Sequence, residues 1–193
     1  MKLLFATHNP HKIAEIRQLL PSWVQLVSLA DLGDNKEIPE TGETLQENAL
    51  IKARTAFRRH GIPCFADDTG LEVEALNGRP GVYSARYAGE ACTPAQNREK
   101  LLQELQGEKN RSALFRTVIA LVGLPQEHLF QGVVKGEILT HEEGSEGFGY
   151  DKLFRPQGHS CTFANMSADQ KNSISHRGKA TQALLGFLNQ LEP

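Results

Sequence analysis

Long apolar runs, paired cysteines and an excess of either charge are all missing from this sequence of 193 residues. No stretch approaches the ~18 consecutive apolar residues that cross a membrane, so no membrane association is expected. The three cysteines lie far apart without CxxC spacing, which excludes a disulfide framework or zinc site and is typical of reduced thiols in the cytoplasm. The 21 basic and 23 acidic residues nearly cancel, so the cationic surface of a nucleic-acid-binding protein is not expected.

The remaining composition indicates one α/β domain spanning residues 1–193. Hydrophobic residues make up 39% of the chain, enough for a sizeable core. Strand and helix patterns alternate first, followed by a long hairpin at 112–139 and a terminal helix. This order predicts a mixed sheet, because long strands joined by a short turn cannot all run parallel.

A phosphate-binding turn is indicated near the N-terminus by the stretch THNPHK. A buried strand over 2–6 precedes it, and Asn9 followed by Pro10 is typical of a helix start. Free backbone N–H groups at such a start attract phosphate. Thr7 could add a hydrogen bond and Lys12 a charge. The alternative is a plain strand–helix turn in which Asn9 only caps the helix.

Two adjacent acids, Asp67 and Asp68, interrupt the apolar stretch FADDTGLEVEAL. Neighbouring residues of a strand face opposite ways, so we expect a strand over 62–66 that ends at the acids and lets them converge. Converging carboxylates can hold Mg²⁺ together with phosphate oxygens. The alternative is an ordinary turn. A lone Asp-Thr-Gly is half of an aspartic protease site, and the acids come too late and too close together for a DxDxT phosphohydrolase.

Three further groups carry chemistry. Glu40 precedes a helix that Thr44 and Glu47 start as a capping box, and Lys52 lies two turns into that helix. Phe148 lies among glycines and could stack on a nucleobase. A basic group follows at a helix start, where cations oppose the helix dipole and an anionic or carbonyl-rich partner is favoured; it comprises Lys171, His176 and Arg177. The alternatives are ordinary surface charges and a core aromatic.

Taken together, these blocks closely resemble the inosine/xanthosine triphosphate pyrophosphatase family. The matching stretches are THNPHK, ETGETLQENALIKA, FADDTGLEVEALNGRPGVYSARYAG, GFGYDKLF and SHRGKA, in the family's order from Thr7 to Ala180. His8 and Thr69 stand where glycine and serine are common in the family. The resemblance covers essentially the whole chain.

The resemblance implies a long central mixed β-sheet flanked by helices, in two lobes with the active-site cleft between them. It also implies a cytoplasmic homodimer that uses Mg²⁺ to hydrolyse ITP, dITP and XTP to the monophosphate and diphosphate, binding neither nucleic acid nor membrane. Two alternatives remain open: a pyrophosphatase for pyrimidine or modified nucleotides on a related scaffold, and a non-catalytic nucleotide-binding module.

Family roles can be transferred to matching positions. Asp68 would be the catalytic residue and a metal ligand, with Glu40 and Asp67 near the Mg²⁺. The residues expected to bind substrate are Thr7, His8, Asn9, Pro10, His11, Lys12, Lys52, Thr69, Phe148, Gly149, Tyr150, Asp151, Lys171, His176 and Arg177. Within this set, the N-terminal residues and Lys52 would contact phosphates, Phe148 would stack on the base, and Lys171, His176 and Arg177 would read its edge.

Overall fold

A computed structural model describes residues 1–191, which divide into two compact units. Unit 1 comprises Met1–Asp68, Thr117–Gly132 and the described residues from Arg177 onward; unit 2 comprises Thr69–Arg116 and Val133–His176. Three strands contribute residues to both units: β3 (Cys64–Val73), β5 (Ser112–Val122) and β6 (His128–Ile138). Among the described residues, no helix combines the length and apolar character that a bilayer crossing requires.

The sheet is mixed, as the sequence predicts. Its strand order is β2-β1-β3-β5-β6-β7, and β4 (Pro80–Gly81) pairs with β3. Strand β1 (Lys2–Phe5) runs parallel to both β2 (Gln25–Ser28) and β3. Antiparallel pairs join β3 to β4 and β6 to β7 (Phe154–Pro156). The short connection between neighbours β5 and β6 permits only an antiparallel hairpin.

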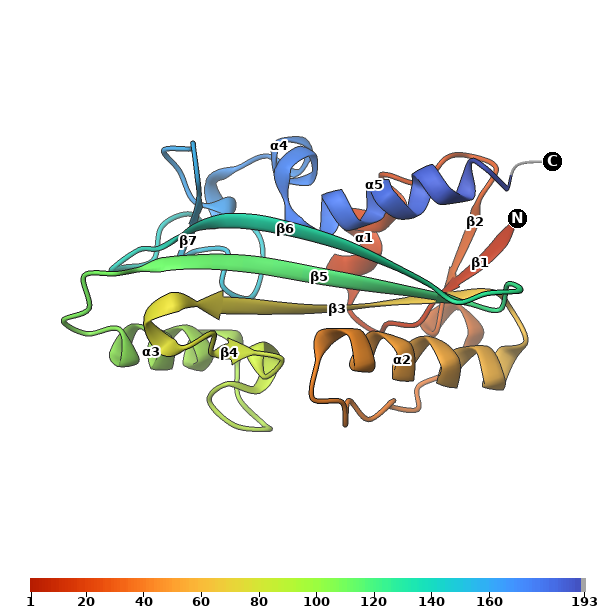
Figure 1. Ribbon diagram of the computed structural model, residues 1–193, viewed down its shortest axis with the longest axis horizontal. Coiled ribbons are helices and arrows are strands. Elements are labelled where there is room, and N and C mark those ends of the chain that lie inside the picture. The colour runs from red at the N-terminus through yellow and green to blue at the C-terminus, as the bar shows by residue number, and fades with distance from the viewer. Residues whose placement is uncertain (192–193) are drawn as a thin grey trace. The chain divides into compact units, whose positions relative to one another are not determined.

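Helices cover both faces of the strands in unit 1 (Figure 1). On one face, Leu3 and Phe5 of β1 share a core with Ile16 of α1 (Pro10–Arg17) and Leu184 of α5 (His176–Leu188). Helix α2 (Leu45–His60) lies on the opposite face (Figure 1), and its buried residues include three alanines, at positions 49, 53 and 56. Alternation along the strands therefore separates two packed layers.

Unit 2 has its own core. Phe115, Phe154 and Phe163 contact one another there, and Leu101 and Leu105 belong to the same cluster. The helices of this unit are α3 (Pro94–Glu104) and α4 (Ala168–Ile174). Single 3₁₀ turns occur in unit 1 at Ala30–Leu32 and in unit 2 at Glu74–Leu76, Ser84–Arg86 and Phe163–Asn165.

The helix starts follow the capping chemistry of the sequence. Asn9 accepts from the first turn of α1, and Pro10 occupies its first position. Thr44 and Glu47 form the expected capping box of α2, which ends at Gly61 in the left-handed conformation that glycine adopts without strain. The strand predicted before the acids is present as β3, but its predicted end is wrong, because β3 passes through both acids and continues to Val73.

Candidate active site

The two adjacent acids point to opposite faces of β3. Asp67 contacts Lys12 of α1 and Arg177 of α5, whereas Asp68 contacts Lys52 of α2. The prediction that they converge where a strand ends is therefore wrong. A regular strand tolerates both buried carboxylates because a cation from a neighbouring helix pairs with the acid on each face. A buried charge is stable in a protein interior when it is paired in this way.

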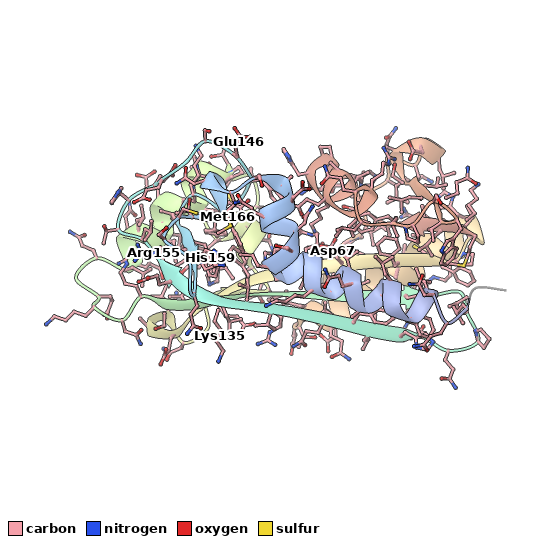
Figure 2. All side chains as sticks on the ribbon, turned by 90° about the horizontal axis from the view of Figure 1, so that it is seen from above. Asp67, Lys135, Glu146, Arg155, His159 and Met166 are labelled. Carbon is pink, nitrogen blue, oxygen red and sulfur yellow. The ribbon has the colours of Figure 1, made fainter. Side chains whose placement is uncertain are left out.

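Asp67 lies at the centre of an ionic network that joins α1, β3 and α5. Its Oδ1 accepts from Lys12 Nζ at 2.9 Å and its Oδ2 from Arg177 Nε at 3.1 Å. Arg177 Nη1 also donates to Glu15 at 2.6 Å. Figure 2 shows Asp67 beside the N-terminal part of α5. Glu15 was not singled out by the sequence, although it shares a helix with Lys12 at a spacing of three residues, which places both on one face.

The electrostatics of this network stabilise the Asp67 carboxylate. Burial by itself raises the pKa of Asp67, but the charges of Lys12 and Arg177 outweigh it and hold that pKa below its ordinary value. Burial is the main reason that the pKa of Lys12 is lowered, with Asp67 acting in the opposite direction. The pKa of Arg177 is raised because Asp67 and Glu15 outweigh its burial.

A second cluster, on the α2 face, consists of Lys52, Glu40 and Asp68. Lys52 Nζ donates to Glu40 Oε1 at 2.5 Å and to Asp68 Oδ1 at 3.1 Å. Burial lowers the pKa of Lys52, but the two carboxylates outweigh it and the net shift is upward. The pKa of Asp68 is raised, first by burial and then by Glu40, despite the charge of Lys52. Two carboxylates therefore share one cation.

One oxygen of this second cluster has no hydrogen-bond partner. Asp68 Oδ2 is buried and receives no donor from the described residues, while its Oδ1 is bonded to Lys52. A buried carboxylate oxygen left in this way favours a ligand that supplies positive charge or a proton donor. No group of three or more His, Cys, Asp or Glu side chains gathers as a metal centre among residues 1–191. Glu40 and Asp68 are a two-carboxylate set, which suffices for Mg²⁺ when waters and phosphate complete the shell.

The turn at residues 7–12 differs from the prediction in one respect. Pro10 has no N–H, and the N–H groups of His11 and Lys12 both donate to Asn9 Oδ1. The next N–H, of Ile13, donates to the Asn9 carbonyl. The first-turn donors are thus used inside the helix start and are not free for phosphate. The Thr7 hydroxyl accepts from Asn9 N, which leaves its own proton available to donate.

His8 and the other residues of this turn lie in unit 1. The ring of His8 hydrogen-bonds the Asp34 carbonyl at 2.7 Å. Asp34 in turn bonds His60 and Arg59. No sequence motif connects Asp34 with this turn, because the two lie 26 residues apart.

Three of the residues assigned to the base, Phe148, Asp151 and Lys171, contact one another in unit 2, whereas Arg177 belongs to the ionic network of Asp67 in unit 1. Asp151 Oδ2 accepts from both Phe148 N at 2.8 Å and Lys171 Nζ at 2.9 Å. The Lys171 ammonium lies 4.8 Å from the centre of the Phe148 ring. Tyr150 donates its hydroxyl to the Ser84 carbonyl at 2.9 Å. Asp151 and Tyr150 therefore use their polar groups to fix the loop, while Phe148 stays half-buried.

Glycines allow this loop to close tightly. Gly149 adopts φ +60° and its carbonyl accepts from Arg98 Nη1 at 2.8 Å. A Cβ on Gly147 would lie within 3.0 Å of Asp151 side-chain atoms, too close for any other residue.

Two further predicted site residues lie outside this loop. His176 is buried, and the centre of its ring stacks 4.6 Å from that of Phe115. Thr69 is half-buried and follows Asp68 on β3.

The chain is similar to known proteins over nearly its whole length. The Ham1 family model matches residues 3–187. The dITP/XTP pyrophosphatase of Flavobacterium psychrophilum is 51% identical, over 97% of this chain and 98% of that protein. The dITP/XTP pyrophosphatase of Porphyromonas gingivalis is 52% identical, over 97% of each.

Solved structures are similar over the full chain. The Staphylococcus aureus Ham1 protein superimposes with a TM-score of 0.90 at 38% identity, covering 100% of both chains. A HAM1 protein from Coxiella burnetii gives a TM-score of 0.91 at 39% identity, covering 98% of this chain and 99% of that one. Sequence and fold agree, and the chain belongs to the Ham1 family.

Proposed function

We propose that this protein hydrolyses dITP, ITP and XTP to the nucleoside monophosphate and diphosphate with the help of Mg²⁺. The observation that carries the proposal is the cluster of buried Lys52 and Asp68 with half-buried Glu40, in which one Asp68 oxygen has no partner among the described residues. The names of the 50%-identical relatives support the substrate class. The raised pKa of Asp68 suits a carboxylate that takes up a proton during turnover.

The proposed reaction adds water across the bond between the α- and β-phosphates. The water oxygen forms a new P–O bond, the bridging P–O bond breaks, and Asp68 accepts the proton that the water loses. Lys12 and Lys52 would stabilise the negative charge of the departing diphosphate. Asp67, with both oxygens already bonded to Lys12 and Arg177, is proposed to position these cations and not to bind metal.

The proposed metal ligands are Glu40 and Asp68. They are carboxylates, which hard cations prefer, and Mg²⁺ needs only one or two of them beside water and phosphate. When bound, Mg²⁺ would neutralise charge on the phosphate oxygens. Lys52 would then be free to leave one carboxylate and contact phosphate.

Base recognition is proposed for the residues of the loop in unit 2 and the following helix start. Phe148 would stack on the purine, while Lys171, His176 and Arg177 would donate to its edge. Hypoxanthine and xanthine present a carbonyl at position 6 where adenine presents an amino group. A buried donor of the protein that faces the amino group of adenine loses its hydrogen bond. Such losses can lower the kcat/KM of the wrong substrate by a factor of ~10⁴ or more. Homodimer formation and a cytoplasmic location are further parts of the proposal.

Product identification tests this function directly. Purified protein is incubated with dITP and Mg²⁺, and the products are followed by ³¹P NMR. The expected products are equal amounts of dIMP and diphosphate, with no orthophosphate. Release of orthophosphate and dIDP would contradict the proposed bond cleavage, and no product from any nucleotide would leave only a binding role.

A further inference from the structure

Asn48 is a fully buried polar residue near the start of α2, between the site residues Glu40 and Lys52 in the sequence. Its Oδ1 accepts from the backbone N–H of Gly42 at 2.8 Å. An N–H can donate only to the oxygen of the amide, so this bond fixes the side-chain orientation. The Nδ2 group is buried and has no partner among the described residues. The oxygen therefore provides the contact that this side chain makes with the loop.

The segment before α2 is held to the first turn of the helix at consecutive residues. Glu47 Oε2 accepts from Glu43 N at 2.7 Å and from Thr44 N at 3.2 Å. Gly42 lies so close to the helix that a Cβ there would be 2.6 Å from Glu47 Cβ and 2.8 Å from Asn48 Oδ1. Only glycine fits this approach without displacing the backbone.

These contacts fix both partners of the Glu40–Lys52 ion pair to one helix. Lys52 lies one helical turn beyond Asn48, on the same face. Glu40 precedes the bonded Gly42 by two residues, which leaves its backbone little freedom. We infer that Asn48 is a positioning residue that acts through Gly42 to hold the Glu40 carboxylate against Lys52 and available to the metal. The metal-binding test of this inference rests on the proposed function, whereas the test by protein stability does not.

The chain contains a matched control in unit 2. Helix α3 starts with Thr93 and Gln96 as a capping box, followed by Asn97, just as Thr44 and Glu47 are followed by Asn48 in α2. Asn97 is also buried and accepts a loop N–H, that of Ala88, at 2.7 Å, while its Nδ2 donates to Ala85 O. The same residue type at the same helix position thus holds a loop that carries no site carboxylate.

The first experiment measures two values. One is the Mg²⁺ concentration for half-maximal dITP hydrolysis, and the other is the Kd of Mn²⁺ in the absence of nucleotide, determined by electron paramagnetic resonance. Asn48→Ala should raise both values about 10-fold or more, as loss of a group that orients a metal ligand does. Asn48→Asp keeps an oxygen acceptor for the Gly42 N–H, so it should shift both values less than Asn48→Ala does. Asn97→Ala should lower stability but leave both values unchanged. Equal shifts in Asn48→Ala and Asn97→Ala, or no shift in Asn48→Ala, would overturn the inference.

The second experiment is independent of catalysis and metal. Urea denaturation is measured for Asn48→Ala, Glu40→Gln and the double variant. If Asn48 holds Glu40 in place, the double variant should lose less stability than the sum of the single losses. Additive losses would overturn the inference even if the enzyme hydrolyses dITP. Gly42→Ala disturbs the same contact from the loop side and should reproduce the metal phenotype if Asn48→Ala does not fold.

Discussion

Neutralising the two adjacent acids should change stability in opposite directions. The folded protein lowers the pKa of Asp67 because Lys12 and Arg177 outweigh its burial, so folding favours its charged form. It raises the pKa of Asp68, chiefly through burial, so folding disfavours that charge. By linkage, removing the first charge removes stabilisation and removing the second relieves a penalty.

The magnitude for Asp67 follows from its surroundings. Removing one partner of a buried ion pair costs about 3–5 kcal/mol, since it leaves an uncompensated charge. The Asp67 and Arg177 side chains are 1% and 3% exposed, whereas Lys12 is 15% exposed. Arg177 also keeps Glu15. Asp67→Ala should therefore lower the free energy of unfolding by about 3–5 kcal/mol, not twice that. Asp67→Asn retains one acceptor, and its loss should be about 1–3 kcal/mol.

Urea denaturation at pH 7.5 measures these changes, with Asp169→Asn, at an exposed position, as the control. Asp68→Asn should be at least as stable as wild type and yet lose turnover by a factor of about 10² or more, because it lacks the base. The reasoning is refuted if Asp67→Asn and Asp68→Asn shift the midpoint in the same direction. Near-full activity of Asp68→Asn with Mg²⁺ would refute the catalytic assignment separately.

Three other outcomes are expected. Burial raises the pKa of the Cys64 thiol to about 12. Iodoacetamide at pH 8 should therefore modify the other two cysteines, which are half-buried, and spare Cys64 in the folded protein. Peptide mass spectrometry identifies the alkylated residues, and alkylation of Cys64 would contradict this prediction. Hydrogen bonds from His60, the backbone and Arg59 lower the pKa of Asp34 to about 2. The stabilisation of the folded state by the Asp34 carboxylate is therefore complete above pH ~4 and is lost as the pH falls toward 2. The gap in urea midpoint between wild type and Asp34→Asn should be smaller at pH 3 than at pH 5, and an equal gap at the two pH values argues against the assignment. Arg177→Ala should narrow the ratio of kcat/KM between ITP and ATP, and an unchanged ratio would remove Arg177 from base recognition.

Local chemistry was readable from the sequence wherever it depends on a few neighbouring residues. Asn9 with Pro10 and Thr44 with Glu47 identify the starts of α1 and α2, because the capping bonds lie within three residues. The hairpin of β5 and β6 follows from two apolar stretches around a short turn. The motif blocks identified the family, which the family model and the relatives confirm.

The course of β3 was not readable in the same way. Two acids inside a strand are tolerated only when cations reach both faces, and Arg177 is 110 residues away from Asp67 in sequence. Local propensity disfavours Asp in strands, so the pattern indicated a strand end where tertiary pairing allows continuation. Glu15 and Asn48 were missed for a related reason, since their roles depend on the partners that folding brings to them.

The most direct test of the central claim is diphosphate release from dITP, ITP, XTP, GTP, ATP and dTTP, each with Mg²⁺ and with EDTA. Rapid release from dITP, ITP and XTP alone, abolished by EDTA and by Asp68→Asn, is the expected result. Preference for dTTP would assign the protein to pyrimidine nucleotides. Release that persists in EDTA, or no release from any substrate, would contradict the roles proposed for Glu40, Lys52 and Asp68.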